Sequence, residues 1–294
     1  MLSNRQLEIF IAVFEEGSMT AAARKIHMTQ PAISQTIKEI EGEYNTEMFE
    51  RYGARLHITQ AGKILYKYAK RILNLHRDLN EAIMLHEGVH EIRLGANISA
   101  GTAQIMPLIQ AFNRIHPGIE VKVMVFQAPV LLKALQENEL DLALIEDQKK
   151  NANFGDLIME PYYQDRITVV ASNTHPYAGK TCRLKDLSED TFLFREKGAG
   201  VRDMFDHILN LKNMSVNIGW QCTSTEAIVD AVEHQVGIAV LPYLLVKKYL
   251  DAGEIQEITL EDVSLSRMLN IVYHKDKVIT QPLQDMIDLI KRCP

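Results

Sequence analysis

The pattern of apolar and polar residues over 18–42 predicts two short helices joined by a tight turn. Ser18 or Thr20 can cap the first helix, and Thr29 can cap the second, with Pro31 in its first turn, where a missing N–H is harmless. One side of this helix pair is apolar and suited to burial: it contains Ala22, Ile26, Met28, Ile33 and Ile37. The second helix then presents amides, a hydroxyl and a cation outward from Gln30, Ser34, Gln35 and Lys38.

A polar helix face of this kind is what reading base edges and phosphates in the major groove of DNA requires. An ordinary helical hairpin with a solvated face has the same pattern, so both interpretations fit this stretch. Residues 48–51 and 55–59 form two short, partly alternating runs around Tyr52-Gly53-Ala54, which predict a small hairpin. Beside a recognition helix such a hairpin is a wing, from which Arg51 and Arg55 could reach phosphates or the neighbouring minor groove.

Residues 59–87 predict one long helix, because Thr59 can cap it and neither a proline nor a glycine after Gly62 interrupts it. Apolar residues recur every seven positions, each followed three positions later by another: Leu65, Tyr68, Ile72, Leu75, Leu79 and Ala82. A seam sustained for about three heptads pairs two helices. Packing on the chain's own C-terminal domain is the alternative, but a homodimer is favoured because two copies related by a two-fold axis would read an inverted repeat.

From residue 92 onward, short apolar strands alternate with amphipathic helices. Strands are expected at 92–96, 120–126, 140–145, 166–171, 216–221 and 237–241, and helices at 102–116, 129–137, 201–211 and 225–234. This alternation is typical of an α/β architecture with largely parallel sheets. A segment of about 200 residues is long for one core, so two subdomains are expected.

Charge and composition narrow the function. The 294 residues carry a net charge of −6, but residues 18–71 hold nine Lys or Arg and five Glu, so this segment is +4. A modestly basic segment in an acidic protein fits a sequence reader with a moderate salt dependence. The three cysteines, Cys182, Cys222 and Cys293, lack metal-ligand spacing, and a structural role is favoured over redox sensing through Cys182 and Cys222. Without an export signal or a membrane-length apolar stretch, a cytoplasmic protein is expected.

Four motifs follow one another from the N-terminus: Ser-x-Thr-x-Ala-Ala at 18–23, Thr-Gln-Pro-Ala-Ile-Ser at 29–34, Phe-x-Arg at 49–51 and Thr-x-Ala-Gly at 59–62. In this order they resemble the LysR-type bacterial transcriptional regulators. The similarity extends over the whole chain, although the C-terminal part matches by pattern more than by motif. Where the family often has a second basic residue at the wing tip, this chain has Ala54.

The resemblance implies an N-terminal all-α winged helix-turn-helix with a long linker helix, and a C-terminal α/β effector domain similar to periplasmic binding proteins. The implied parts are a winged domain 1–58 with the helix-turn-helix at 18–37, a linker and dimerisation helix 59–87, a hinge 88–91, and an effector domain 92–294 whose lobe one is 92–161 plus 267–294 and whose lobe two is 162–266. The resemblance further implies double-stranded DNA as partner, a dimer or a tetramer built from two dimers, and contact with RNA polymerase.

A ligand is expected in the cleft between the two lobes, where strands end and helices begin. Its candidate residues are Ser99, Gly101, Thr102, Gln127, Gly200, Arg202 and Thr223. Hydroxyls and backbone N–H groups of such loops could hold an anion, although ordinary caps and turns have the same composition. Residues 198–202 resemble the family's Gly-x-Gly-x-Arg loop, whose backbone and Arg face the cleft. A small carboxylate, sulfate or phosphate-bearing effector is therefore expected.

The competing hypothesis is a solute-binding protein or an enzyme without a DNA-directed function, because the effector fold also serves transport and catalysis. The missing export signal disfavours transport. Catalysis is disfavoured because the chain has no Ser-x-x-Lys, nucleophile elbow or complete phosphate-binding loop, and because His116, His175 and His234 are scattered. No catalytic residue, metal or cofactor is expected.

Overall fold

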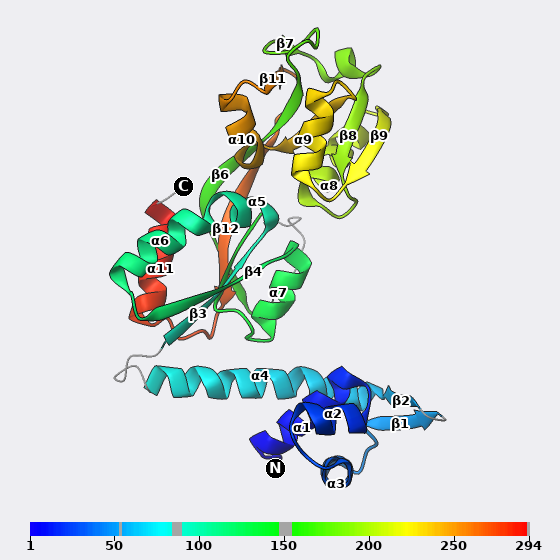
Figure 1. The fold of residues 1–294 in the computed structure, drawn as a ribbon, viewed down its shortest axis with the longest axis vertical. Coiled ribbons are helices and arrows are strands. Elements are labelled where there is room, and N and C mark those ends of the chain that lie inside the picture. Colours follow the sequence, from blue (N-terminus) through cyan, green and yellow to red (C-terminus); the bar gives the residue numbers. More distant parts are fainter. Residues whose placement is uncertain (53–54, 84–89, 147–154, 293–294) are drawn as a thin grey trace.

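The structure of the chain is a computed structural model that describes residues 1–52, 55–83, 90–146 and 155–292. It contains an N-terminal domain, a long helix, and a C-terminal domain of two lobes joined by crossing strands (Figure 1). The long helix lies between the N-terminal domain and the first of these lobes. The two-lobed α/β architecture and the helix-turn-helix expected from the sequence are confirmed.

The N-terminal domain contains α1 (Asn4–Glu16), α2 (Met19–Lys25), α3 (Gln30–Tyr44) and a hairpin of β1 (Phe49–Tyr52) and β2 (Arg55–Ile58). Ser18 caps α2, because its Oγ accepts a hydrogen bond from the Ala21 N–H at 3.4 Å. Thr29 stands at the cap position of α3, but its side chain makes no cap hydrogen bond, so that prediction is wrong. Pro31 lies in the first turn as expected, and it removes one of the N–H groups that a cap would bind.

The apolar side of the helix pair is buried as predicted. It places Ala22, Ile33 and Ile37 in the domain core and Ile26 and Met28 at its edge. Phe49 of β1 packs on Phe10 of α1 with ring centroids 5.3 Å apart. The hairpin is therefore attached to the same core as α3.

The long helix α4 (Gln60–Ile83) begins where the sequence predicts. The Gly62 N–H donates to Thr59 Oγ1 at 3.0 Å, which confirms the cap. Leu65 and Tyr66 pack against the N-terminal core, and the Tyr66 ring stacks on Phe14 with centroids 3.7 Å apart. The first turns of α4 thus belong to the N-terminal domain, and Leu65 is engaged within its own protomer.

Lobe one is built on parallel strands covered by helices. Its elements are β3 (His90–Ala96), α5 (Ile98–Ala103), α6 (Ile105–Ile115), β4 (Ile119–Val125), α7 (Ala128–Gln136), β5 (Leu142–Glu146), the first part of β6 (Leu157–Ser172), β12 (Ser266–His274) and α11 (Gln281–Arg292). Strand β3 pairs in parallel with β4 and β5, and β12 pairs antiparallel with β5 and β6.

Lobe two repeats this plan. Its elements are the second part of β6, β7 (Thr181–Cys182), the 3-10 helix η2 (Leu184–Leu187), β8 (Thr191–Arg195), α8 (Gly200–Leu211), β9 (Asn217–Cys222), α9 (Thr225–Glu233), β10 (Ile238–Pro242), α10 (Tyr243–Asp251) and β11 (Ile255–Leu260). Strand β8 pairs in parallel with β9 and β10, whereas β10 and β11 run antiparallel to β6.

Two long strands, β6 and β12, connect the lobes. The 16 residues of β6 pair with β12 in lobe one and with β10 and β11 in lobe two, so one mixed sheet of ten described strands runs through the domain. The expected strand 166–171 is only the second part of β6. Its first part escaped prediction because Pro161 and a run of polar residues up to Arg166 interrupt the apolar pattern.

The expected helix 102–116 is two helices, and this prediction is wrong in detail. Asn97 caps α5 by accepting the Ala100 N–H at 2.8 Å, so the helix starts before residue 102. The chain then turns at Gln104, where α6 begins. This break directs Ile105, Leu108 and Phe112 into the core of lobe one.

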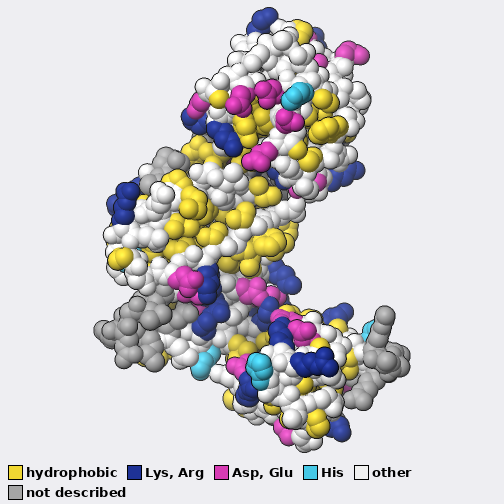
Figure 2. All heavy atoms as spheres, viewed as in Figure 1, with side chains coloured by type: hydrophobic (Ala, Val, Ile, Leu, Met, Phe, Trp, Pro, Cys, Tyr) yellow, Lys and Arg dark blue, Asp and Glu magenta, His cyan; other side chains and the backbone are white. Residues whose placement is uncertain are grey.

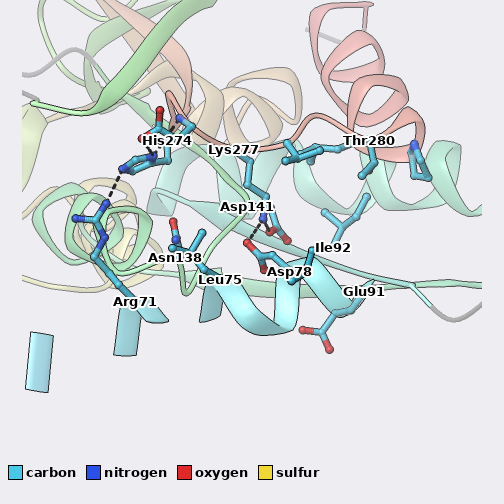
Figure 3. A pocket seen from close by; sticks show the side chains of 15 residues that line it. Arg71, Leu75, Asp78, Glu91, Ile92, Asn138, Asp141, His274, Lys277 and Thr280 are labelled. Atoms are coloured by element: carbon cyan, nitrogen blue, oxygen red, sulfur yellow. Dashed lines mark hydrogen bonds and ion pairs between the residues drawn. The ribbon is translucent and has the colours of Figure 1, made fainter. Parts of the chain in front are cut away.

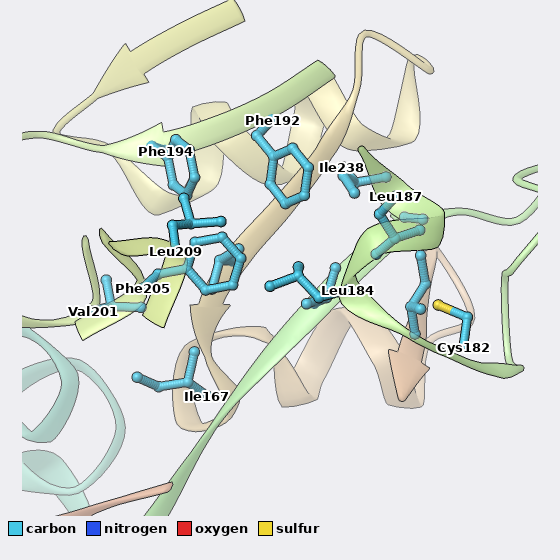
Figure 4. Close-up of a cluster of buried hydrophobic side chains, with 14 of the residues drawn as sticks. Ile167, Cys182, Leu184, Leu187, Phe192, Phe194, Val201, Phe205, Leu209 and Ile238 are labelled. Carbon is cyan, nitrogen blue, oxygen red and sulfur yellow. The ribbon is translucent and has the colours of Figure 1, made fainter. Parts of the chain in front are cut away.

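The core of lobe two is dominated by aromatic rings (Figure 4). Phe192, Phe194 and Phe205 contact one another with ring centroids 5.7 to 5.8 Å apart. Cys182 lies in the same cluster, and burial raises the pKa of its thiol. A buried thiol with a raised pKa is a poor nucleophile, which supports a structural role. Cys293 lies outside the described residues.

Lobe one also has an uncovered edge. Strand β4 ends the sheet, and its Val123 and Val125 are exposed together with the adjoining Phe126. Figure 2 shows hydrophobic side chains gathered on the side of this lobe that faces the viewer, over which β4 passes in Figure 1.

Candidate nucleic-acid interface and effector cleft

The predicted DNA-reading residues lie together on one side of α3. Gln30, Gln35 and Lys38 are exposed, as are Thr29 and Pro31 at the start of the helix, and Ser34 is half-buried. The opposite side of α3 buries Ile33, Ile37 and Ile40 completely, which fixes how the helix faces solvent. The arrangement presents two amides and a cation from a rigid helix.

The hairpin is tied directly to α3 by Glu41. Its Oε1 accepts the backbone N–H groups of Met48 and Phe49 at 2.8 and 3.2 Å. Glu41 is a residue that sequence reasoning missed, since a glutamate on a helix has no pattern that indicates a partner seven residues away. Strands β1 and β2 are antiparallel, with Tyr52 opposite Arg55. The side chains of Arg51 and Arg55, and residue Ala54, lie outside the described part.

The seam predicted on α4 is largely uncovered within one protomer. Tyr68, Ile72, Leu75 and Leu79 are each between 46 % and 56 % exposed. Leu65 is the exception, because it packs on the N-terminal core. Ile64 takes its place at the start of the exposed stripe, which continues to Ile83. The side chain of Ala82 lies outside the described part.

The last turns of α4 are bound to lobe one through polar contacts (Figure 3). Asp78 accepts from Arg93 Nη2 and from Lys277 Nζ, both at 2.7 Å, and both cations also contact the buried Asp141. Burial raises the pKa of Asp78 even though Lys277 acts in the opposite direction. The four groups form a network that joins helix and lobe.

Two further contacts strengthen this junction. Asn74 Nδ2 donates to the Glu137 carbonyl at 2.6 Å, and Arg71 Nη2 lies 3.4 Å from His274 Nε2. Burial and the Arg71 charge lower the pKa of His274, so its ring favours the neutral form. A cavity of about 310 Å³ lies between α4 and the lobe.

The cleft between the lobes holds a second, smaller cavity of about 130 Å³. Lobe one contributes the ends of β3, β4 and β5, and lobe two contributes the loop before α8 and the end of β10. Its lining residues are Asn97, Ile98, Ser99, Gln127, Ala128, Pro129, Glu146, Arg195, Glu196, Gly198, Ala199, Gly200, Val201, Asp203, Pro242 and Arg267. The cavity therefore lies where strands end and helices begin, which is where the sequence predicts a ligand site.

Three of the predicted effector residues line the cavity. Ser99 is buried, and its Oγ accepts from Arg267 Nη2 at 2.7 Å. Gln127 Nε2 donates across the cleft to Glu196 Oε1 at 3.2 Å. Gly200 is the first residue of α8.

The other predicted residues lie elsewhere. Thr102 and Thr223 are exposed but do not line the cavity, and Ser224 rather than Thr223 caps α9. Gly101 faces Val125 of β4, since a Cβ there would lie 2.8 Å from that side chain. These positions were assigned from loop composition, which does not determine the direction in which a loop residue points.

Arg202 points into lobe two instead of into the cleft. Its side chain is 4 % exposed, donates to Asp206 Oδ2 at 2.8 Å and lies over the Phe194 ring at 3.9 Å. Arg202 shares a helix face with Phe205 and Leu209, which are buried. That spacing of three and seven residues was the signal in the sequence that could have indicated its direction.

Two arginines that the sequence did not single out face the cavity. Arg267 of β12 pairs with Asp165 of β6 at 2.7 Å. Arg195 pairs with Glu196 at 2.9 Å and donates to Thr225 Oγ1 at 3.2 Å. Burial acts to raise the pKa of Glu196, but the Arg195 contacts outweigh it and lower that pKa. Both of these arginines thus have a carboxylate partner.

Within the described residues, no group of three or more His, Cys, Asp or Glu side chains is placed to hold a metal ion. Among the helices of the described ranges, none combines the length and apolar character needed to cross a membrane.

Two family models match the chain. Residues 4–63 match the bacterial regulatory helix-turn-helix protein of the lysR family, and residues 86–293 match the LysR substrate binding domain. The HTH-type transcriptional regulator CysL of Bacillus subtilis is 28% identical over 97% of this chain and 95% of its own length. The uncharacterized regulator YwqM of the same organism is 31% identical over 98% of both. 

The solved structures show the same fold. Full-length CbnR complexed with its target DNA superposes with a TM-score of 0.72 at 18% identity, and the match covers 100% of both chains. The chain belongs to the LysR family of bacterial transcriptional regulators.

Proposed function

We propose that this regulator reads an inverted repeat in promoter DNA as a homodimer and responds to a small anionic effector held between the two lobes of its C-terminal domain. The observation that carries the proposal is the polar side of α3, where Gln30, Gln35 and Lys38 are exposed over fully buried isoleucines. We further propose that the role is regulatory and not enzymatic, and that the protein acts in the cytoplasm.

The chemistry of α3 suits sequence reading. An amide side chain can form two hydrogen bonds with adenine in the major groove, and a lysine can contact phosphate or guanine. Glu41 holds the base of the hairpin on α3, so the hairpin would follow α3 when that helix enters the groove. Phosphate contacts from the hairpin would then fix the register of α3 on the bases.

Dimerisation is supported by the stripe on α4. Its exposed apolar side chains, from Ile64 to Ile83, would bury their surface against a second copy of the same helix. Two-fold symmetry of such a pair would place two α3 helices on two half-sites of an inverted repeat. The resemblance to the family makes a tetramer of two dimers the natural larger assembly.

The helices that begin at the cleft favour an acidic effector. Helices α7 and α8 begin at the cavity, and the first N–H groups of a helix attract negative charge. Arg195 and Arg267 line the same cavity. An effector can change the geometry of the lobes only by binding one arrangement more tightly than another.

The contacts of α4 indicate how such a change would reach DNA. Its first turns pack on the N-terminal core and its last turns are bound to lobe one by Asn74 and Asp78. The DNA-binding domain, α4 and lobe one would therefore move together, while lobe two moves relative to them about β6 and β12.

The test is a binding titration of the full-length protein on the DNA upstream of its own gene, with footprinting to locate the site. We expect protection of an inverted repeat, and weaker binding to DNA that carries only one half-site. Equal affinity for the single half-site and the repeat would contradict the dimer. Protection that is indifferent to the DNA sequence would contradict reading by α3.

A further inference from the structure

Two carboxylates lie where the lobes meet across the cleft. Glu196 of lobe two accepts from Gln127 of lobe one. Glu146, the last residue of β5 in lobe one, lies against Gly200 of lobe two. Both contacts occur in the cavity where the effector is proposed to bind.

The position of Glu146 is set from both lobes. Asn97, at the end of the neighbouring strand, donates its Nδ2 hydrogen to Glu146 Oε2. The other oxygen, Oε1, lies so close to residue 200 that a Cβ there would be 2.6 Å from it. Glycine at this position is therefore what leaves room for the carboxylate.

This place is electrostatically favourable for an acid. Gly200 is the first residue of the 12-residue helix α8, and the preceding Ala199 supplies no side-chain cap. The first N–H groups of α8 have no partner one turn earlier, and they carry the positive end of the helix dipole. A carboxylate from the opposite lobe thus occupies the kind of position that the acidic group of an effector would take.

We propose that Glu146 competes with the effector for one position in the cleft. In the free protein its carboxylate occupies the space beside Gly200 at the start of α8, here called the seat, and the acidic group of the effector displaces it. The inference rests on the proposed anionic effector in the cleft. It assigns to Glu146 the control of effector affinity, and it makes effector binding break a contact between the lobes.

Displacement follows from the charges around the seat. Among the described residues that line the cavity, Glu146, Glu196 and Asp203 face Arg195 and Arg267, so acids outnumber bases there. An incoming anion that left Glu146 in place would lie beside this second negative charge. Binding is favourable when the acidic group of the effector replaces the Glu146 carboxylate. The start of α8 then faces one negative charge both before and after binding.

The experiment titrates inorganic phosphate and inorganic sulfate into the full-length protein at pH 7 by calorimetry. Glu146→Asp keeps the charge but shortens the side chain by one methylene, so it vacates the seat. Glu146→Gln keeps the length and removes the charge. Asp203→Asn is the matched control, because it removes one charge from the same cavity while its oxygen can still accept from the Gly198 N–H, as Asp203 does at 3.3 Å.

We expect both Glu146 variants to bind the anions about three- to tenfold more tightly than the wild type, and Asp203→Asn to change affinity by less than twofold. Gly200→Ala should abolish binding, because the added Cβ fills the seat. Melting of each variant, followed by circular dichroism, confirms that it is folded.

Three outcomes would overturn the inference. If Glu146→Asp binds as the wild type does, vacating the seat has no effect. If Asp203→Asn gains as much as Glu146→Gln, charge alone explains the change. In either case, if Gly200→Ala still loses binding, the proposed anion site remains supported and only the role of Glu146 is refuted. If no variant binds either anion, the anionic effector fails together with the role of Glu146.

Discussion

Replacing Arg267 by Met removes one partner of the ion pair that joins the crossing strands. Arg267 and Asp165 are opposite each other on β12 and β6, with Nη2 and Oδ2 2.7 Å apart. Their side chains are 7 % and 0 % exposed. Burial raises the pKa of Asp165 even though Arg267 acts in the opposite direction. The charge on Asp165 is therefore sustained by Arg267.

The expected loss in the free energy of unfolding is about 3–5 kcal/mol at pH 7, because a buried carboxylate is left without compensation. Adding Asp165→Asn to the same chain removes that charge. The double variant should then lose only about 1–2 kcal/mol, the cost of polar groups with incomplete hydrogen bonds. The difference between the two variants isolates the uncompensated charge.

The loss should also depend on pH. Because the pKa of Asp165 is raised in the folded state, the folded protein binds more protons than the unfolded one. Protonation of Asp165 therefore stabilises the fold at low pH, and this stabilisation disappears as the pH rises through the folded-state pKa. Without Arg267 that pKa rises further, so the deficit of Arg267→Met should shrink when the pH is lowered from 7 to 5.

Urea unfolding at both pH values measures these quantities. The single tryptophan of the chain, Trp220, lies on β9 and reports on lobe two. Circular dichroism follows the helices of both lobes in the same samples. Equal destabilisation of the single and double variants, or a deficit that does not change between pH 7 and pH 5, would refute the role assigned to the ion pair.

Ile72→Glu combined with Leu79→Glu places unpaired charges in the stripe of α4, which is costly in an apolar interface; sedimentation should show a smaller species that binds half-sites only, and an unchanged oligomer would move the interface elsewhere. Lys38→Ala should weaken binding to all DNA sequences alike and lower the salt slope by about one unit; an unchanged slope would remove Lys38 from the phosphate contacts. Phe205→Ala empties a fully buried aromatic position and should cost about 3–5 kcal/mol in thermal or urea unfolding; a loss below about 1 kcal/mol would contradict tight packing there.

The N-terminal domain was predictable because local patterns determine it. The apolar spacing of Ala22, Ile33 and Ile37 and the cap at Ser18 specify where the helices start and which side they bury. Thr29 shows the limit of such reasoning, since a residue can hold the cap position without forming the cap bond. Whether it does so depends on the N–H groups that Pro31 leaves available.

The alternation of strands and helices in the effector domain was predictable from the sequence. The two long strands that pass between its lobes were not. Strand β6 pairs with β12 across more than a hundred residues of sequence, and no local pattern records that pairing. Arg267, which lines the cleft cavity, and its partner Asp165 come from these two strands. They were missed because their chemistry arises only when the strands meet.

The directions of the loop side chains could not be predicted for a different reason. Composition showed that Gly198–Arg202 begins a helix, but the direction of each side chain depends on which face of that helix is buried. Arg202 lies on the face of Phe205 and is enclosed by lobe two. Gly200 remains at the cavity because α8 starts there.

The central claim is that α3 chooses the DNA sequence, and the most direct measurement compares base preference before and after its polar face is removed. Binding to a set of single-base variants of the footprinted site would be measured for the wild type and for a chain carrying Gln30→Ala, Ser34→Ala and Gln35→Ala together. We expect discrimination to relax by about 1–3 kcal/mol at each base pair that an amide contacts, while non-specific affinity persists. An unchanged site preference in the triple variant would contradict the assignment of α3 as the recognition helix.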